Sequence, residues 1–466
     1  MTDPDNADQA PQPAPADPQP PASLWRHRDF MLLWGGQSIS EIGSAVTVVA
    51  LPLTAVVALH ASTFEVGALT AAGTVCFLLV ALPAGMLVDR VRKRRLMLGC
   101  DLARMAIIGS VPVAAAFGVL TLVQLFAVAV LAGLATVFFD VAYQSYVPVL
   151  LPRERLHDGN GKLGATQAFA QVSGPGLGGL LFGLVRAGAM TVDALSFAAS
   201  AASLTLIRTR QPRPVRPAPA QAARPRGALR AEFSAGLSFV LRHPVLRKIA
   251  ACTGTANLFG QIAFALDIVF LIRVVHVAPA VTGVLLSAGG LGGILGGVLS
   301  GPLSRKIGTA RIVWVSMLVF GAVPVVLPLT GPGPALAFFP IAMFGTGFTA
   351  TVYNIAQLSY RQLICPPELL GRMNAAIRWI VWGTLPLGGL LGGVLGGLVG
   401  IRPALWISVI GSWAASLWVV FSPLRRMRDI PAEDSGSPGA GSPGAGSPGA
   451  GSSGPAGLVG PEPSPA

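Results

Sequence analysis

Long apolar runs, separated by short polar segments, fill the chain from about residue 30 to residue 421. Each run has about 20 residues or more, the length that a helix needs to cross a hydrocarbon layer roughly 30 Å thick. Because backbone polar groups inside a membrane must be paired within the structure, each run is expected to be a helix. The pattern predicts twelve helices, over residues 30–58, 65–88, 96–118, 121–150, 162–185, 189–207, 245–272, 280–303, 311–330, 334–361, 375–399 and 402–421.

Composition supports a lipid environment. Charged residues make up 11% of the 466, and hydrophobic residues make up 52%. A soluble domain carries roughly 25% charged residues, so a chain this apolar is not expected to form a water-soluble globule. The sequence has no G-x-x-x-x-G-K-[ST] loop and no nucleophile, base and orienting group at a recognisable spacing. We therefore expect a membrane protein that is neither an ATP-driven pump nor an enzyme.

The cysteines indicate no metal site, and no cofactor is expected. All four lie in or beside apolar runs, without a CxxC motif or a Cys/His cluster: Cys76, Cys100, Cys252 and Cys365. They are expected to be free thiols that pack as small hydrophobic groups.

Two tails and a linker divide the chain. The N-terminal tail is rich in Pro, Ala, Asp and Gln, and the C-terminal tail repeats GSPGA three times. Such compositions predict disorder, and the first tail lacks the features of a signal peptide. The expected organisation is a tail over 1–23, a six-helix bundle over 24–208, a linker over 209–243 with a short amphipathic helix near 229–241, a second six-helix bundle over 244–423 and a tail over 424–466.

Positive charge is unevenly distributed between the two sides of the predicted membrane. The chain has 33 Lys and Arg against 20 Asp and Glu, a net charge of +13. If the N-terminus is cytoplasmic, 29 cations fall on cytoplasmic segments, including Arg361, and only Arg186, Arg273 and Arg402 fall outside. Arg104 alone lies within a span. Because Lys and Arg favour cytoplasmic loops, both termini are predicted to be cytoplasmic, and the charge excess does not indicate a nucleic-acid partner.

The two halves repeat each other. A shift of 214 residues superposes 177–185 on 391–399 with seven identities in nine. The same shift pairs polar and Pro positions between 142–160 and 356–374. An even number of helices in each half gives both halves the same orientation, as in one large transporter fold.

The segment Gly85 to Arg95 (GMLVDRVRKRR) follows the second predicted span. It resembles the loop signature G-x-x-x-D-R/K-x-G-x-R-R/K of the major facilitator superfamily, with Arg92 in place of the second glycine. The matching positions are Gly85, Asp89, Arg90, Arg94 and Arg95. A degenerate copy (GPLSRKIG) occupies 301–308 in the second half.

This loop is expected to act as a cytoplasmic gate. Asp89 can form a charge-assisted contact with a helix N-terminus or with an arginine of the other bundle, near Arg372 or Arg378. The contact would form in one access state and break in the other. An alternative is that Arg90 to Arg95 only orient the chain in the membrane.

The fifth predicted span resembles the drug-exporter motif G-x8-G-x3-G-P-x2-G. Its matching residues are Gly161, Gly174, Pro175 and Gly178, with Ala170 in place of one glycine. Small residues allow close helix packing, and Pro175 is expected to bend the helix.

These motifs, with the phrases WGGQSISEIG over 34–43 and DALSF over 193–197, give a resemblance that covers about 25–423. The chain is similar to the drug:proton antiporter branch of the superfamily, which includes macrolide-efflux-type proteins and exporters of siderophores such as enterobactin. The resemblance implies an all-α, polytopic protein of the plasma membrane with two six-helix bundles, acting as a monomer by alternating access. Related branches have an arginine in span four for proton coupling, and residues 121–150 contain none.

Charged groups inside predicted spans are costly and therefore mark candidate functional positions. Glu41, Asp140 and Asp267 lie in spans one, four and seven, which the resembling fold places with span ten around a central cavity. Glu41, the deepest carboxylate, is the first choice as proton carrier. The polar residues expected to line the same cavity are Gln37, Tyr143, Gln144, Asn257, Gln261, Tyr353, Asn354 and Gln357.

Structural roles compete with these assignments. Glu41 can be a neutral acid bonded to a neighbouring helix, and the amides can join helices. Arg104, one turn after Asp101, is expected to order helices near the cytoplasmic face, and Asp193 is either a helix cap or a binding group.

The leading hypothesis is a secondary transporter that exports small amphiphilic molecules, such as drugs, antibiotics or secondary metabolites, by proton antiport. Its partners are the cargo, protons and the bilayer. Uptake of a small metabolite by proton symport is the first alternative, and a transport-inactive sensor or scaffold is the second.

Overall fold

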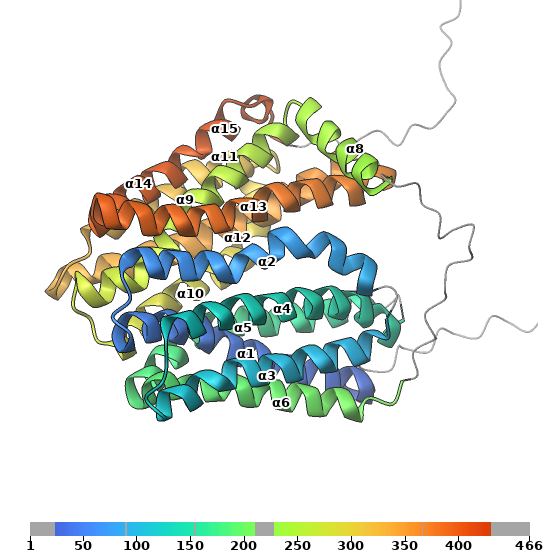
Figure 1. Ribbon diagram of the computed structural model, residues 1–466. Coiled ribbons are helices and arrows are strands. Elements are labelled where there is room, and N and C mark those ends of the chain that lie inside the picture. Colours follow the sequence, from blue (N-terminus) through green and yellow to red (C-terminus); the bar gives the residue numbers. More distant parts are fainter. Residues whose placement is uncertain (1–23, 89–90, 153–154, 210–227, 366, 430–466) are drawn as a thin grey trace, which may run out of the picture. The chain divides into compact units, whose positions relative to one another are not determined.

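The computed structural model describes residues 24–88, 91–152, 155–209, 228–365 and 367–429, and helices are the only regular elements in these ranges (Figure 1). Both predicted tails lie outside these ranges except for 424–429. Most of the predicted linker also lies outside them.

Six long helices form the first half. They are α1 (Arg28–Leu53), α2 (Thr63–Val88), α3 (Lys93–Ala116), α4 (Leu122–Leu150), α5 (Leu156–Val185) and α6 (Met190–Leu206). A π-helical turn, Thr54–Ala58, continues α1, and a 3-10 turn, Arg186–Ala189, separates α5 from α6.

The second half begins with α8 (Ala228–Arg242), at the position where the linker sequence predicts an amphipathic helix. It continues with α9 (Leu246–Arg273), α10 (Pro279–Ile307), α11 (Arg311–Leu318), α12 (Phe338–Ile364), α13 (Pro367–Leu398), α14 (Ile401–Ala414) and α15 (Ser416–Val420).

These elements contain the twelve predicted crossings. Eleven stretches of the described chain are long and apolar enough to span a membrane. One of them, Asp158–Leu206, is 49 residues long and includes both α5 and α6. The all-helical, polytopic fold class is therefore confirmed.

The ninth predicted span is not one continuous α-helix. Its α-helical part, α11, ends at Leu318, and the chain continues as a 3-10 segment, Phe320–Leu329. Pro324 and Pro328 lie in this segment. Proline lacks a backbone N–H and its ring clashes with the carbonyl four residues earlier, which disfavours the α-helical hydrogen-bond pattern here.

Two pairs of long helices join the halves: α2 packs along α13, and α5 packs along α10. Both contacts need glycine. A Cβ atom on Gly67 would lie 2.6 Å from the Gly393 Cα, and one on Gly179 would lie 2.6 Å from the Gly283 Cα. Such close approach of helix backbones is the packing that small residues permit in membranes.

The halves also meet at the end that holds the α1–α2 and α9–α10 loops. Arg273, the last residue of α9, donates to the Ala61 carbonyl oxygen in the first half. A buried cluster joins Val46 and Phe182 to Ile268 and Val269 of the other half. This end is therefore closed by contacts between the halves.

Candidate functional site

A cavity of about 760 Å3 lies among α1 to α6, with Phe264 of α9 at its wall. Five of the predicted cavity residues line it: Gln37, Glu41, Asp140, Tyr143 and Gln144. They come from α1 and α4, whose facing sides are also lined by Ser40, Ser44, Thr47 and Thr136. We call this space the first cavity.

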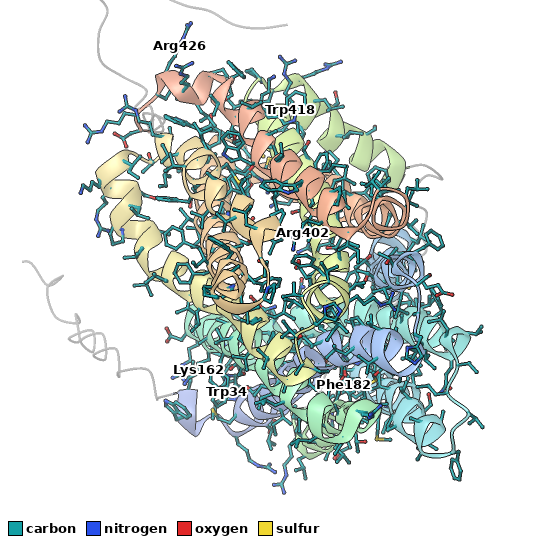
Figure 2. The ribbon with its side chains drawn as sticks, turned by 90° about the vertical axis from the view of Figure 1, so that its left-hand side faces the viewer. Trp34, Lys162, Phe182, Arg402, Trp418 and Arg426 are labelled. Carbon is teal, nitrogen blue, oxygen red and sulfur yellow. The ribbon has the colours of Figure 1, made fainter. Side chains whose placement is uncertain are left out.

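Hydrogen bonds join α1 to α5 beside the first cavity. The Trp34 indole donates to the Thr166 hydroxyl over 3.0 Å, and the Ser38 hydroxyl lies 3.2 Å from the same atom. The Lys162 amine sits 3.4 Å from the centre of the Trp25 ring and 5.4 Å from that of Trp34. Figure 2 shows Lys162 beside Trp34. These contacts fix the register of the two helices at this wall.

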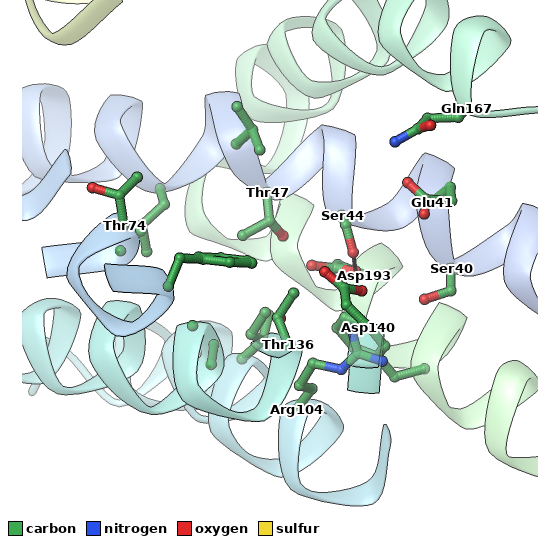
Figure 3. Close-up of a pocket in the computed structure, with 18 of the residues that line it drawn as sticks. Ser40, Glu41, Ser44, Thr47, Thr74, Arg104, Thr136, Asp140, Gln167 and Asp193 are labelled. Atoms are coloured by element: carbon green, nitrogen blue, oxygen red, sulfur yellow. Dashed lines mark hydrogen bonds between the residues drawn. The ribbon is translucent and has the colours of Figure 1, made fainter. Parts of the chain in front are cut away.

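Asp193 of α6 contributes a third carboxylate to the first cavity. Its side chain is fully buried, and its Oδ1 accepts from the Ser44 and Ser196 hydroxyls over 3.4 and 3.3 Å. Its Oδ2 has no hydrogen-bond partner among the described residues. The N-cap of α6 is Ala189, so the helix-cap interpretation of Asp193 is wrong. Figure 3 shows Asp193, Asp140 and Arg104 among the residues that line this cavity.

Arg104 of α3 lines the same cavity and is only 5% exposed. Its guanidinium pairs with Asp101 and lies 4.2 Å from the ring centres of both Phe139 and Phe197. The other Asp101 oxygen accepts from the Ser200 hydroxyl over 2.7 Å. Arg104 thus joins α3, α4 and α6, and it also forms part of the cavity wall.

Glu41 is half-buried on α1. Its Oε1 accepts from the Gln37 side-chain amide one turn earlier, over 2.9 Å. The bond stays within one helix, so it does not tie Glu41 to a neighbouring helix as the structural alternative required.

A second cavity, of about 610 Å3, lies among α12, α13, α2 and α4. Two more predicted residues, Asn354 and Gln357, line it together with Asn374, Arg361 and Arg378. Phe77 of α2 lines both cavities and packs edge-on against Trp382 of α13, with ring centres 4.9 Å apart. This aromatic pair lies where the two cavities approach each other.

Four predicted cavity residues line neither of these spaces. Asp267 is 4% exposed, and its Oδ1 has no partner among the described residues. The Tyr353 hydroxyl lies 2.8 Å from the Thr253 hydroxyl, which joins α12 to α9. Asn257 is half-buried, and Gln261 lies against Gly388 of α13. Their functional assignment stays a prediction.

The predicted gate segment is only partly described. Asp89 and Arg90 lie outside the described residues. Gly85 belongs to α2, where a Cβ atom would meet nothing within 4 Å, and Arg95 is exposed. Arg94 donates to the Leu204 and Thr205 carbonyl oxygens over 2.6 Å each. It therefore satisfies free carbonyl groups at the end of α6, a favourable place for a cation.

The predicted packing motif of α5 lies at two helix interfaces. A Cβ atom on Gly174 would lie 2.1 Å from that of Ala45, and one on Gly178 would lie 2.9 Å from the Val46 carbonyl oxygen, both in α1. The Pro175 carbonyl oxygen would lie 2.3 Å from a Cβ atom on Gly283 of α10. Substitution of these glycines would therefore push α5 away from α1 or α10. Bending at Pro175 stays a prediction.

The predicted cavity residues did not include two cations that line the second cavity. Arg361, counted with the cytoplasmic cations, is an 8% exposed residue of α12, and Arg378 lines the same cavity from α13. The spacing could have placed Arg361 at the cavity. It follows Gln357, a predicted cavity residue, by one helical turn and therefore lies on the same face of the helix. Arg104 was recognised as an intramembrane cation, but only packing reveals its aromatic neighbours.

Comparison with known proteins gives consistent matches. A family model described as transmembrane secretion effector matches residues 20–438. The multidrug efflux pump Tap of Mycolicibacterium fortuitum is 27% identical over 84% of this chain and 95% of its own. Macrolide efflux protein A of Streptococcus pyogenes is 28% identical over 38% of this chain and 44% of its own. The crystal structure of a bacterial homologue of the iron transporter ferroportin is 17% identical, covering 85% of this chain and 98% of its own, with a TM-score of 0.67.

Proposed function

The chain belongs to the transmembrane secretion effector family of the major facilitator superfamily, and from that premise we propose that it exports small amphiphilic molecules, including drugs, in exchange for protons. Two relatives are named as drug efflux proteins, one of which matches along nearly its full length. This similarity supports drug efflux as the activity, and proton antiport is the proposed source of energy.

The first cavity is the observation on which the proposal rests. It combines apolar wall residues, such as Val48 and Phe77, with the carboxyl groups of Glu41, Asp140 and Asp193. An amphiphilic cation can contact both kinds of group. A proton and a cationic cargo that compete for the same carboxylates cannot both be bound, and that competition couples their movement in opposite directions.

We propose Glu41 as the first proton carrier, with Asp140 beside it. The Gln37 side-chain amide donates a hydrogen bond to the Glu41 carboxylate. Because this neighbour carries no charge, Glu41 can still take up a proton.

The proposal places both termini on the cytoplasmic side. The end that holds the α1–α2 and α9–α10 loops then faces outward. Arg273 and the apolar cluster close this end, which supports a state that is closed to the outside. In this scheme Asp89 forms the cytoplasmic gate contact after the cavity turns outward.

The test uses the full chain in sealed proteoliposomes. Ethidium movement is measured with and without a pH gradient, for the wild-type chain and for Glu41→Gln. Antiport predicts gradient-driven ethidium movement that Glu41→Gln removes, with Glu65→Gln as the matched control because Glu65 lies outside both cavities and bonds to Ser62. Normal gradient-driven transport by Glu41→Gln would reject the proton role of Glu41.

Proton symport in the uptake direction remains the alternative, and the same assay separates it from antiport. Under symport, ethidium moves in the direction of the proton flux. Under antiport, it moves against that flux.

A further inference from the structure

Two arginines line the second cavity. They are Arg361 and Arg378, and none of the described residues of its wall is acidic. Within the described part of the chain, neither arginine forms an ion pair. Arg361 is only 8% exposed, and a charge removed from water without a counter-charge is costly, so its burial calls for an explanation.

Arg361 is held in place but not fully satisfied. Its side chain donates to the Gln357 Oε1 over 3.1 Å and to the Asn374 Oδ1. Its Nε is buried and has no hydrogen-bond partner among the described residues. Two neutral amides therefore orient a planar guanidinium at the cavity wall while leaving its charge uncompensated, which suits recognition of an oxygen anion.

Arg378 adds a second cation from another helix. It is exposed, and its guanidinium lies 5.2 Å from the centre of the Trp382 ring, which also lines the cavity. It also lies within electrostatic range of Asp140 at the first cavity. The second cavity thus offers two cations, three amide side chains and an aromatic wall beside the acidic first cavity.

We infer that the second cavity is an anion subsite that receives a carboxylate, sulfonate or phosphate group of an amphiphilic cargo, with Arg361 as the main ligand and Arg378 as the second. This inference rests on the proposed export function, because it describes part of the chemistry of the cargo. It extends the range of cargo to acidic and zwitterionic amphiphiles, whose basic groups would face the first cavity.

The test compares two probes that differ by one charge. The full chain is placed in nanodiscs of phosphatidylcholine, and binding of dansylglycine and of its methyl ester is followed by energy transfer from tryptophan, since Trp379 and Trp382 line the cavity. We expect saturable binding of the acid about tenfold tighter than that of the ester. Equal affinity for acid and ester in the wild-type chain would overturn the inference.

Variants assign the preference to the two arginines. Arg361→Gln should abolish it, Arg361→Lys should retain part of it because the charge remains, and Arg378→Gln should weaken it. Arg311→Gln, a substitution at an exposed position outside both cavities, is the matched control and should keep the full preference. If Arg361→Gln does not fold, Arg378→Gln and Arg361→Lys still test the assignment. An unchanged preference for the acid over the ester in both variants would contradict it.

Two further measurements separate the possible failures. Repeating the titration in phosphatidylglycerol nanodiscs tests whether a lipid headgroup is the anion: an undiminished preference supports cargo, and its loss overturns the cargo assignment. Ethidium transport by the wild-type chain tests the proposed function independently. Selection of the acid without ethidium transport would reject that function and leave the anion subsite standing.

Discussion

The two cavities are lined in part by helices that repeat each other, and they differ in charge. A shift of 214 residues relates α4 to α12 and α5 to α13. At that shift Asp140 of the first cavity corresponds to Asn354 of the second, and Arg361 of the second corresponds to Val147. The repeat has preserved helix packing while the ionisable positions have diverged. A scaffold of this kind can offer one acidic and one basic surface to the same cargo.

The largest expected effect concerns the buried pair that supports the first cavity. Arg104→Gln would leave Asp101 without its counter-charge and remove the cation between Phe139 and Phe197. We expect a loss of stability of about 3 kcal/mol or more, measured as the free energy of unfolding in mixed micelles. Arg311→Gln is exposed and should change it by less than about 0.5 kcal/mol. An unaltered unfolding curve for Arg104→Gln would show that the pair does not support the fold.

Asp140→Asn makes the first cavity resemble the second at this position. We expect gradient-driven ethidium efflux to fall about 10- to 100-fold, because a carboxamide cannot bind a proton and the cationic cargo in alternation. The measurement is the initial rate in proteoliposomes at equal protein content. A rate equal to that of the wild-type chain would remove Asp140 from the coupling mechanism.

Asn354→Asp is the reciprocal change. It introduces a carboxylate next to Gln357, whose side chain contacts Arg361. The new charge should compete with an anionic ligand, so we expect the preference for dansylglycine over its ester to shrink by about tenfold. Retention of the full preference would mean that Arg361 does not bind the anion.

The smallest expected effect lies in the gate segment. Arg94→Gln removes two bonds to the end of α6 and should cost about 0.3–1 kcal/mol of unfolding free energy. Arg95→Gln is the control, since Arg95 is exposed. Equal effects of the two substitutions would indicate that Arg94 contributes only charge to this segment.

The lengths of the apolar runs predicted all twelve crossings. A membrane-spanning helix needs a certain length and a low polarity, and both can be read directly from the sequence. The conformation of the ninth span was not predicted, although Pro324 and Pro328 were visible. The repeat predicted two halves of the same orientation but not which helices join them, and the close contacts of Gly174 and Gly178 lie in the helix where the motif predicted close packing.

The site was less predictable because it depends on which helix faces meet. Helix-by-helix reasoning placed Glu41 and Asp140 at one cavity, but it also grouped Asp267 and Tyr353 with them. Both lie on α9 or α12 faces that pack against neighbours. Counting Arg361 as a loop cation concealed the second cavity, since a charge-counting rule cannot distinguish a loop residue from one in the last turn of a helix.

Proton release on cargo binding tests the central claim most directly. Ethidium is added to the purified full chain in weakly buffered solution, and a pH indicator reports the protons released for each ethidium bound. Competition at the carboxylates of the first cavity predicts release by the wild-type chain and a clear reduction in Glu41→Gln or Asp140→Asn. Saturable ethidium binding to the wild-type chain without proton release would contradict the account.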